Sequence, residues 1–271
     1  MQPLQTNIAF RQNTEIEIET GLKTQSPLMK DIYQKVKSIS LLSNHLVLIG
    51  ETGVGKKSIA HAIHRNSSRV HGPFHSFYCM STSEDEFKEA FWEQVYVENE
   101  HLLLKYDVLE KASNGFLYLN KFSELTTAFM LNIIESYIHG CNQLFRYNFD
   151  ISPRLIISIS LDSFQQLNKT EEWNTLLMLL NPVSIILPPL RERREDIPAF
   201  VEIFIEEARS SDPAWNRLGV TDGAMRECLA YKWPGNIRQL KNAIFQGALL
   251  SQGHLIDTHH LPFSMNWQLP Y

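Results

Sequence analysis

The sequence predicts an α/β fold in which a parallel sheet lies between two layers of helices and is followed by a small all-α subdomain. Short continuous apolar runs alternate with amphipathic stretches as far as Leu187, which is typical of strands buried on both faces of a parallel sheet. The first of these runs ends in a glycine-rich turn that leads into a helical pattern, as a βαβ unit begins. After Pro188-Pro189 only helical patterns follow.

The composition is that of a globular protein. The chain has 271 residues, of which 44% are hydrophobic, and a net charge of −5. These values exclude a mainly disordered chain and argue against a surface built to bind nucleic acid. Three scattered cysteines indicate neither a disulfide framework nor a structural zinc site. Because no apolar run reaches about 18 residues and the first residues lack the features of a signal peptide, we expect a cytoplasmic protein with no membrane partner.

The elements of the first part of the chain follow from local patterns. Residues 1–21 form a polar lead-in, which is either a linker or a short edge strand. Apolar spacing then predicts a helix that begins at Ser26-Pro27, a strand over Leu46–Ile49 and a helix over Ser58–His64.

Later patterns complete the two subdomains. Three more strands are predicted, over residues 116–119, 155–159 and 183–187. Four more helices are predicted, over residues 126–139, 196–209, 222–232 and 236–251. We therefore expect an α/β subdomain over residues 22–190 and a helical subdomain over residues 191–271.

The glycine-rich turn carries the pattern GxxxxGK, which binds phosphate. Backbone N–H groups of such a loop surround the anion, the following helix adds its dipole, and the lysine reaches the phosphates. Lys57 stands where the pattern has Ser or Thr, so the hydroxyl that holds Mg²⁺ is missing, and Ser58 comes one residue late. The nucleotide-binding residues predicted from this motif are Gly50, Glu51, Thr52, Gly53, Val54, Gly55, Lys56, Lys57 and Ser58.

Four segments resemble the AAA+ domain of bacterial enhancer-binding proteins, the activators that remodel sigma-54 RNA polymerase. They are Gly50–Lys56, Gly72-Pro73-Phe74, LPPLRERREDIP over residues 187–198 and WPGNIRQL over residues 233–240. The resemblance runs from about residue 22 to residue 262. It implies a P-loop AAA+ three-layer sandwich with a helical lid, a ring-forming ATPase with nucleotide at the subunit interface, and Arg238 as a lid residue that approaches the phosphates.

The family's hydrolytic groups are missing from this sequence. Its Walker B strand ends in Asp-Glu, whereas Asn120 and Lys121 stand here. The Asp holds the Mg²⁺ shell and the Glu orients the attacking water. We therefore expect hydrolysis to be defective, we name no catalytic residue, and Mg²⁺ has no clear carboxylate ligand at this strand.

Other family positions have changed as well. Tyr78 replaces the Asn that partners the catalytic Glu, and Ile159-Ser160 replace the polar sensor Thr-Asn. Trp173 and Leu179 occupy the two arginine-finger positions. Residues 96–101, YVENEH, replace the GAFTGA loop that contacts sigma-54, so we do not expect sigma-54 remodelling.

Several residues receive a plainer interpretation. The arginines of the sheet-to-lid joint match the family, but we expect them to pair with nearby glutamates rather than with a ligand: Arg191, Arg193 and Arg194, with Glu192 and Glu195. Core packing is expected of three aromatic residues, Phe74, Phe77 and Tyr78. His259-His260 is expected to form a solvated cap or turn rather than a metal site.

These features predict the central AAA+ domain of a bacterial transcription regulator that binds ATP or another nucleotide without turnover. It is expected to act by ligand-dependent oligomerisation or conformational change. Biofilm regulators of the VpsR type are similar in lacking the sigma-54 loop, which makes cyclic di-GMP a candidate ligand. The expected partners are further copies of the chain, as a dimer or ring, and RNA polymerase through a full-length regulator. We expect the chain to be a fragment, with DNA bound only by a domain not present here.

Two alternatives and one open question accompany this prediction. The chain could be a slow ATPase that uses Glu124 as its base, or a protein-interaction scaffold that binds no nucleotide. The Lys121 ammonium either stands near the γ-phosphate, where it replaces charge that Mg²⁺ normally supplies, or points to solvent.

Overall fold

The computed structural model describes residues 24–79, 93–95, 103–105, 107–146 and 152–262. Their contacts divide them into two compact units. The sheet unit takes the described residues of 32–50 and 56–187, and the lid unit takes those of 22–31, 51–55 and 188–271. The loop residues 51–55 thus group with the later helices, and the subdomain boundaries expected from the sequence stay a prediction.

The sheet unit is built on five parallel strands in the order β2-β5-β6-β1-β7. These strands are β1 (Leu46–Ile49), β2 (Phe74–Tyr78), β5 (Phe116–Asn120), β6 (Arg154–Ile159) and β7 (Val183–Ile186). The parallel α/β fold is confirmed. Of the short segments elsewhere, β3 (Glu93–Val95) and β4 (Leu103–Lys105) form a separate antiparallel pair.

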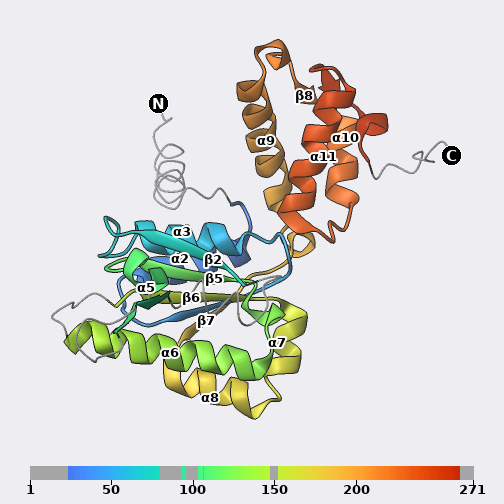
Figure 1. The fold of residues 1–271 in the computed structure, drawn as a ribbon. Helices are drawn as coiled ribbons and strands as arrows, with labels where there is room; N and C mark the ends of the chain where they lie inside the picture. Colours follow the sequence, from blue (N-terminus) through green and yellow to red (C-terminus); the bar gives the residue numbers. More distant parts are fainter. Residues whose placement is uncertain (1–23, 80–92, 96–102, 106, 147–151, 263–271) are drawn as a thin grey trace, which may run out of the picture. The chain divides into compact units, whose positions relative to one another are not determined.

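The inner strands are buried on both faces, as continuous apolar runs predict. Every residue of β1 and β6 is buried, and so are the first four residues of β5. The edge strands differ, because β2 and β7 each expose alternate residues. In Figure 1 helix α3 (Lys56–Arg65) covers one face of the sheet, and α6 (Thr127–Arg146), α7 (Leu161–Leu167) and α8 (Glu171–Leu180) cover the other.

Two shorter elements and one long helix complete this part of the chain. They are α5 (Asp107–Lys111), the 3₁₀ turn η1 (Phe122–Glu124) and α2 (Pro27–Ser40). Helix α2 buries Met29, Tyr33 and Val36, which recur at helical spacing along one face.

The lid unit contains three helices of nine to fifteen residues around its own core. They are α9 (Ile197–Ser211), α10 (Asp222–Ala230) and α11 (Asn236–Leu250), and short 3₁₀ turns lie at η2 (Leu190–Glu192), η3 (Arg194–Asp196), η4 (Pro213–Trp215) and η5 (Thr258–His260). The core centres on Trp233, whose indole Nε1 donates to the Cys228 carbonyl at 2.7 Å.

The expectation of an all-α lid needs one correction. Strands β8 (Gly219–Val220) and β9 (Leu255–Ile256) form a two-residue parallel pair. Segments this short carry no periodic signal, so the sequence pattern missed them. His260 lies in η5 and accepts from the Asp257 N–H at 3.0 Å, which agrees with the expected cap. Within the described ranges, no helix has both the length and the apolar character that a membrane crossing demands.

Candidate nucleotide-binding site

The phosphate-binding loop joins the end of β1 to the start of α3. Gly50 N–H donates to the Ile159 carbonyl at 3.3 Å, which fixes the end of β1 to β6. Gly53 and Gly55 have φ of 82° and 103°, a conformation that favours glycine. Helix α3 begins at Lys56, whose Nζ donates to the Gly50 carbonyl. The first N–H groups of a helix have no intrahelical acceptor, so this turn offers donors to an anion.

Within the lid unit, the loop is held through the Glu51 carboxylate. Arg191 donates to both carboxylate oxygens, at 2.7 and 2.9 Å. Asn236 Nδ2 donates to Glu51 Oε2 at 3.0 Å and to the Thr52 carbonyl at 3.1 Å. The hydrogen bonds that Arg191 donates to Glu51 are the main cause that raises the pKa of Arg191. The expected pairing of Arg191 with Glu192 or Glu195 is therefore wrong, because the Arg191 guanidinium is hydrogen-bonded to Glu51 instead.

The middle of the loop lies directly against the first turn of α11. Ile237 N–H donates to the Gly53 carbonyl at 3.1 Å. A Cβ added to Gly53 would lie 2.3 Å from the Gly235 carbonyl oxygen and 3.2 Å from the Arg238 Cβ. Arg193, which is 2% exposed, donates to the Val54 carbonyl. The structure thus brings two residues predicted from separate motifs, Gly53 and Arg238, side by side.

In the sheet unit, the end of β5 is joined to β6 by a short polar network. Ser158 Oγ donates to Asn120 Oδ1 at 3.2 Å and accepts from the Lys121 N–H at 3.1 Å. Lys121 has a φ of 56°, and its ammonium lies 5.7 Å from the centroid of the Tyr78 ring. The residues that the sequence resemblance matches to the family's Asp-Glu pair and its Asn partner therefore lie together.

The aromatic residues of β2 only partly fill the core. Tyr78 is 49% exposed, so the expectation that it packs in the core is wrong. Tyr78 is the last residue of an edge strand, and the Lys121 ammonium lies over its ring. Phe77 packs against the core, whereas Phe74 stacks on His61 at a ring-centroid distance of 4.0 Å. Burial lowers the pKa of His61, which favours a neutral ring.

The two positions matched to arginine fingers lie in different surroundings on α8. Trp173 is 1% exposed within the core of the sheet unit, and its indole Nε1 has no acceptor among the described residues. Leu179 is 46% exposed. Ser160 caps α7 by accepting from the Ser163 N–H at 3.0 Å. The hexapeptide at residues 96–101 lies outside the described residues.

The ends of β5 and β6 present an amide, an ammonium and hydroxyls, from Asn120, Lys121, Ser158 and Ser160. Burial raises the pKa of the neighbouring Cys79 thiol to about 12, so this thiol is neutral. Glu124, the alternative base, is exposed on η1. Across the described ranges, no three His, Cys, Asp or Glu side chains gather as a metal site would need.

Sequence reasoning missed the Glu51–Arg191–Asn236 network. Arg191 lies 140 residues from Glu51, and Asn236 lies 185 residues from it. No periodicity or motif spacing links positions so far apart, and opposite charge alone singles out no pair. Helices and strands could be predicted from local patterns, whereas this network depends on tertiary structure.

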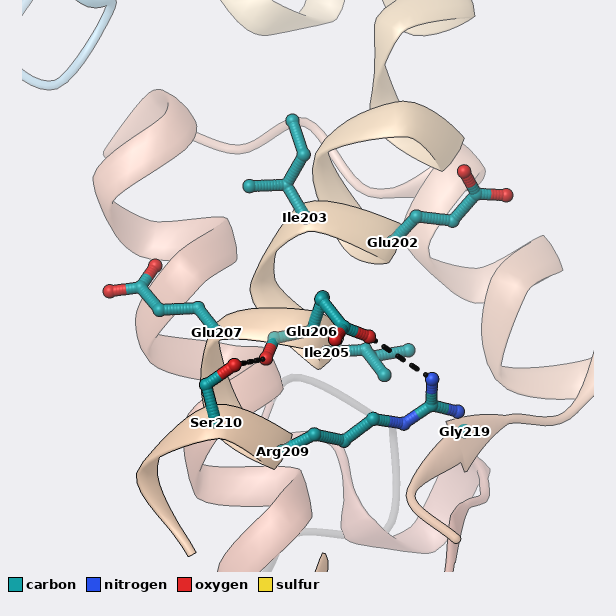
Figure 2. A pocket seen from close by; sticks show the side chains of 8 residues that line it. All are labelled: Glu202, Ile203, Ile205, Glu206, Glu207, Arg209, Ser210 and Gly219. Atoms are coloured by element: carbon teal, nitrogen blue, oxygen red, sulfur yellow. Dashed lines mark hydrogen bonds and ion pairs between the residues drawn. The ribbon is translucent and has the colours of Figure 1, made fainter. Parts of the chain in front are cut away.

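A hollow on the lid unit lies on α9, and none of the predicted loop residues lines it. Figure 2 shows its lining, in which three of the charged side chains are paired: Arg209 with Glu206 at 3.3 Å, and Glu207 with Lys241. The Arg209 guanidinium also donates to the Leu218 carbonyl.

The parallel sheet, the glycine loop between β1 and α3, and the helical lid define a P-loop NTPase fold of the AAA+ type. Comparison with known proteins makes the assignment more specific. Residues 22–138 match the Sigma-54 interaction domain family, and residues 191–269 match the AAA+ ATPase lid domain family.

Several regulators and solved structures are similar to the chain. The regulatory protein AtoC of Escherichia coli K12 is 31% identical over 246 residues, which are 88% of this chain and 52% of AtoC. The Nif-specific regulatory protein of Klebsiella pneumoniae is 29% identical over 245 residues, which are 89% of this chain and 46% of that protein. A structure of Brucella abortus NtrX in complex with ATP matches with a TM-score of 0.68 and 25% identity, over 97% of this chain and 61% of NtrX.

The chain therefore contains a sigma-54 interaction domain followed by an AAA+ lid domain, and it is homologous to bacterial enhancer-binding regulators. It spans about half the length of the curated relatives it matches.

Proposed function

We propose that this chain binds a nucleotide on residues 50–58 and is defective in hydrolysing it, as the central domain of a bacterial transcription regulator. One observation carries the proposal. The phosphate loop keeps its glycine conformations and its lysine, while the position of the catalytic carboxylate holds Lys121, whose ammonium lies over the Tyr78 ring. Binding groups are retained and hydrolytic groups are replaced.

The loop fits the polyphosphate of a nucleotide. Gly53 and Gly55 keep side chains out of the loop, and the first turn of α3 supplies backbone donors. Lys56 supplies a cation next to those donors, and Arg238 is the second cation that the resemblance implies. The ATP-bound NtrX structure supports a nucleotide ligand, because its fold and sequence are similar over nearly the whole chain.

Binding is expected to depend little on Mg²⁺. Magnesium prefers carboxylate and hydroxyl oxygens, and here Lys57 and Asn120 stand where the family places a hydroxyl and a carboxylate. An ammonium at position 121 would repel a divalent cation and attract phosphate. We propose that Lys121 supplies part of the charge that Mg²⁺ supplies in active relatives.

The regulator is proposed to act by a change of shape or of oligomeric state, as a dimer or a ring, rather than by sigma-54 remodelling. RNA polymerase would be contacted through the full-length regulator, and DNA through a further domain. Cyclic di-GMP is the second candidate ligand, by likeness to VpsR-type biofilm regulators that lack the sigma-54 loop. Slow turnover with Glu124 as base is disfavoured, since that side chain is exposed on η1.

Calorimetric titration with ATP, ADP and cyclic di-GMP, combined with a phosphate-release assay, tests this function. The proposal expects ATP to bind without phosphate release, and Lys56→Ala to remove binding. Phosphate release that depends on Glu124 would instead establish a slow ATPase. Binding of none of the three ligands would leave the scaffold alternative, and binding of cyclic di-GMP alone would identify the ligand as a cyclic dinucleotide.

A further inference from the structure

We infer that Glu51 and Asn236 are positioning residues for phosphate recognition, because they fix the first turn of α11, and with it Arg238, against the phosphate loop. The inference rests on the proposed nucleotide binding, and it concerns residues of the lid unit alone. It adds a role for a loop side chain whose identity the GxxxxGK pattern leaves open.

Four consecutive residues of the loop are held by hydrogen bonds within the lid unit. Each of the residues Glu51, Thr52, Gly53 and Val54 has a hydrogen bond to residues 191–193 or 236–237. The Glu51 carboxylate uses both oxygens: Oε1 accepts from Arg191, and Oε2 accepts from Arg191 and Asn236. A bidentate arginine–carboxylate pair fixes orientation as well as distance.

Asn236 is fully buried and has a left-handed φ of 53°. Its side chain makes three hydrogen bonds: Oδ1 accepts from the Leu190 N–H at 2.7 Å, and Nδ2 donates to Glu51 and to the Thr52 carbonyl. A non-glycine residue in this conformation carries strain, and such strain persists only where surrounding contacts determine it. The network around Asn236 supplies those contacts.

The backbone at the start of α11 connects this network to Arg238. The Ile237 N–H, which follows Asn236 directly, donates to the Gly53 carbonyl at 3.1 Å. The loop thereby satisfies one of the helix N–H groups that lack an intrahelical acceptor. Arg238 is the next residue, and its Cβ lies against Gly53. Anything that displaces Asn236 therefore displaces the backbone that carries Arg238.

Stability alone does not account for this arrangement. The side chains of Arg191 and Glu51 are 38% and 24% exposed, so solvent screens this pair even though its bidentate geometry strengthens it. Lys241 and Glu207, with exposures of 42% and 48%, form a comparable pair in the same unit without touching the loop. This second pair provides a matched control.

The test is a double-mutant cycle read out as ATP affinity. We expect Glu51→Ala and Arg238→Ala each to weaken ATP binding about tenfold, and the double variant to be weaker by about tenfold rather than a hundredfold. Glu51→Gln keeps an acceptor for Asn236, so we expect it to stay within about threefold of wild type. Glu207→Ala should leave ATP affinity unchanged. A hundredfold loss in the double variant, or a Gln variant as weak as the Ala variant, would overturn the inference.

A second readout needs no ligand. Amide hydrogen exchange over residues 235–240 should quicken in Glu51→Ala and stay unchanged in Glu207→Ala, with both variants checked for a wild-type fold by circular dichroism. Unchanged exchange in Glu51→Ala would overturn the positioning role. If wild-type protein binds no ATP but Glu51→Ala quickens exchange, the proposed nucleotide function fails while the positioning role stands.

Discussion

The end of β1 and the end of β5 differ in the kind of chemical group that each places at the candidate site. At β1 the recognition elements are backbone groups, and Gly53 and Gly55 keep the conformations that present them. At β5 the working elements would be carboxylate side chains, and Asn120 and Lys121 stand there instead, tied to Ser158 and Tyr78. Backbone recognition survives many substitutions, whereas hydrolysis depends on single side chains, so the second can be lost while the first remains.

The largest expected effect comes from placing an arginine at a position that the family resemblance matches to an arginine finger. Trp173→Arg would place a guanidinium in the core of the sheet unit, since Trp173 is 1% exposed. We expect stability to fall by about 3–5 kcal/mol, as an unpaired charge and a packing defect are introduced together. Urea unfolding measures this change.

Trp173→Phe is the matched control for that substitution. It removes an indole N–H that has no acceptor in the described part of the chain, which offsets part of the lost packing. We expect a change within about 1.5 kcal/mol. A stable Trp173→Arg protein that releases phosphate would contradict our placement of this position.

The next largest effect concerns the phosphate loop after β1. Lys56→Ala removes the cation beside the loop, and we expect ATP affinity to fall about a hundredfold, or about 2.7 kcal/mol. Lys169→Ala removes an equal charge from an exposed turn after α7 and should change affinity less than about twofold. Equal losses in both variants would show that binding depends on net charge rather than on the loop.

A smaller effect separates two glycines of the loop. A Cβ added to Gly55 would make one ordinary contact, at 3.6 Å to Ile237. We therefore expect Gly55→Ala to lower stability by about 1–2 kcal/mol, from the positive φ alone. Gly53→Ala adds a clash 2.3 Å from the Gly235 carbonyl oxygen. It should therefore be less stable than Gly55→Ala by a further 1 kcal/mol or so. Thermal unfolding of the two variants measures the difference, and equal midpoints would contradict the close approach of loop and lid.

The smallest effect concerns the end of β5. Asn120→Asp combined with Lys121→Glu returns two carboxylates to the end of β5, and we expect ATP binding to become about tenfold tighter with Mg²⁺ than with EDTA, or about 1.4 kcal/mol. Turnover should stay absent, because Trp173 and Leu179 are unchanged. Phosphate release by this variant would show that the missing carboxylates were the sole defect.

Much of the fold could be predicted from the sequence because it follows from local patterns. The buried strands and the loop after β1 lie where the sequence predicts them, because continuous apolar runs and the GxxxxGK pattern can be recognised within a few residues. The two-residue β8–β9 pair was too short to leave a signal. Tyr78 was misjudged because sequence does not reveal that β2 lies at the sheet edge.

The candidate site shows the same difference between features that follow from local patterns and features that depend on tertiary structure. Gly53 and Arg238 could be predicted separately from motifs, whereas the Glu51–Arg191–Asn236 network joins positions that only tertiary structure brings together. The partner of Arg191 was predicted wrongly, because adjacent glutamates are visible in sequence and a distant one is not.

The most direct test of the account is ATP binding measured on one preparation with Mg²⁺ and again with excess EDTA, with phosphate release followed in parallel. Our account predicts dissociation constants that agree within about threefold and no release above that of Lys56→Ala. Binding that requires Mg²⁺ and is followed by phosphate release would contradict it.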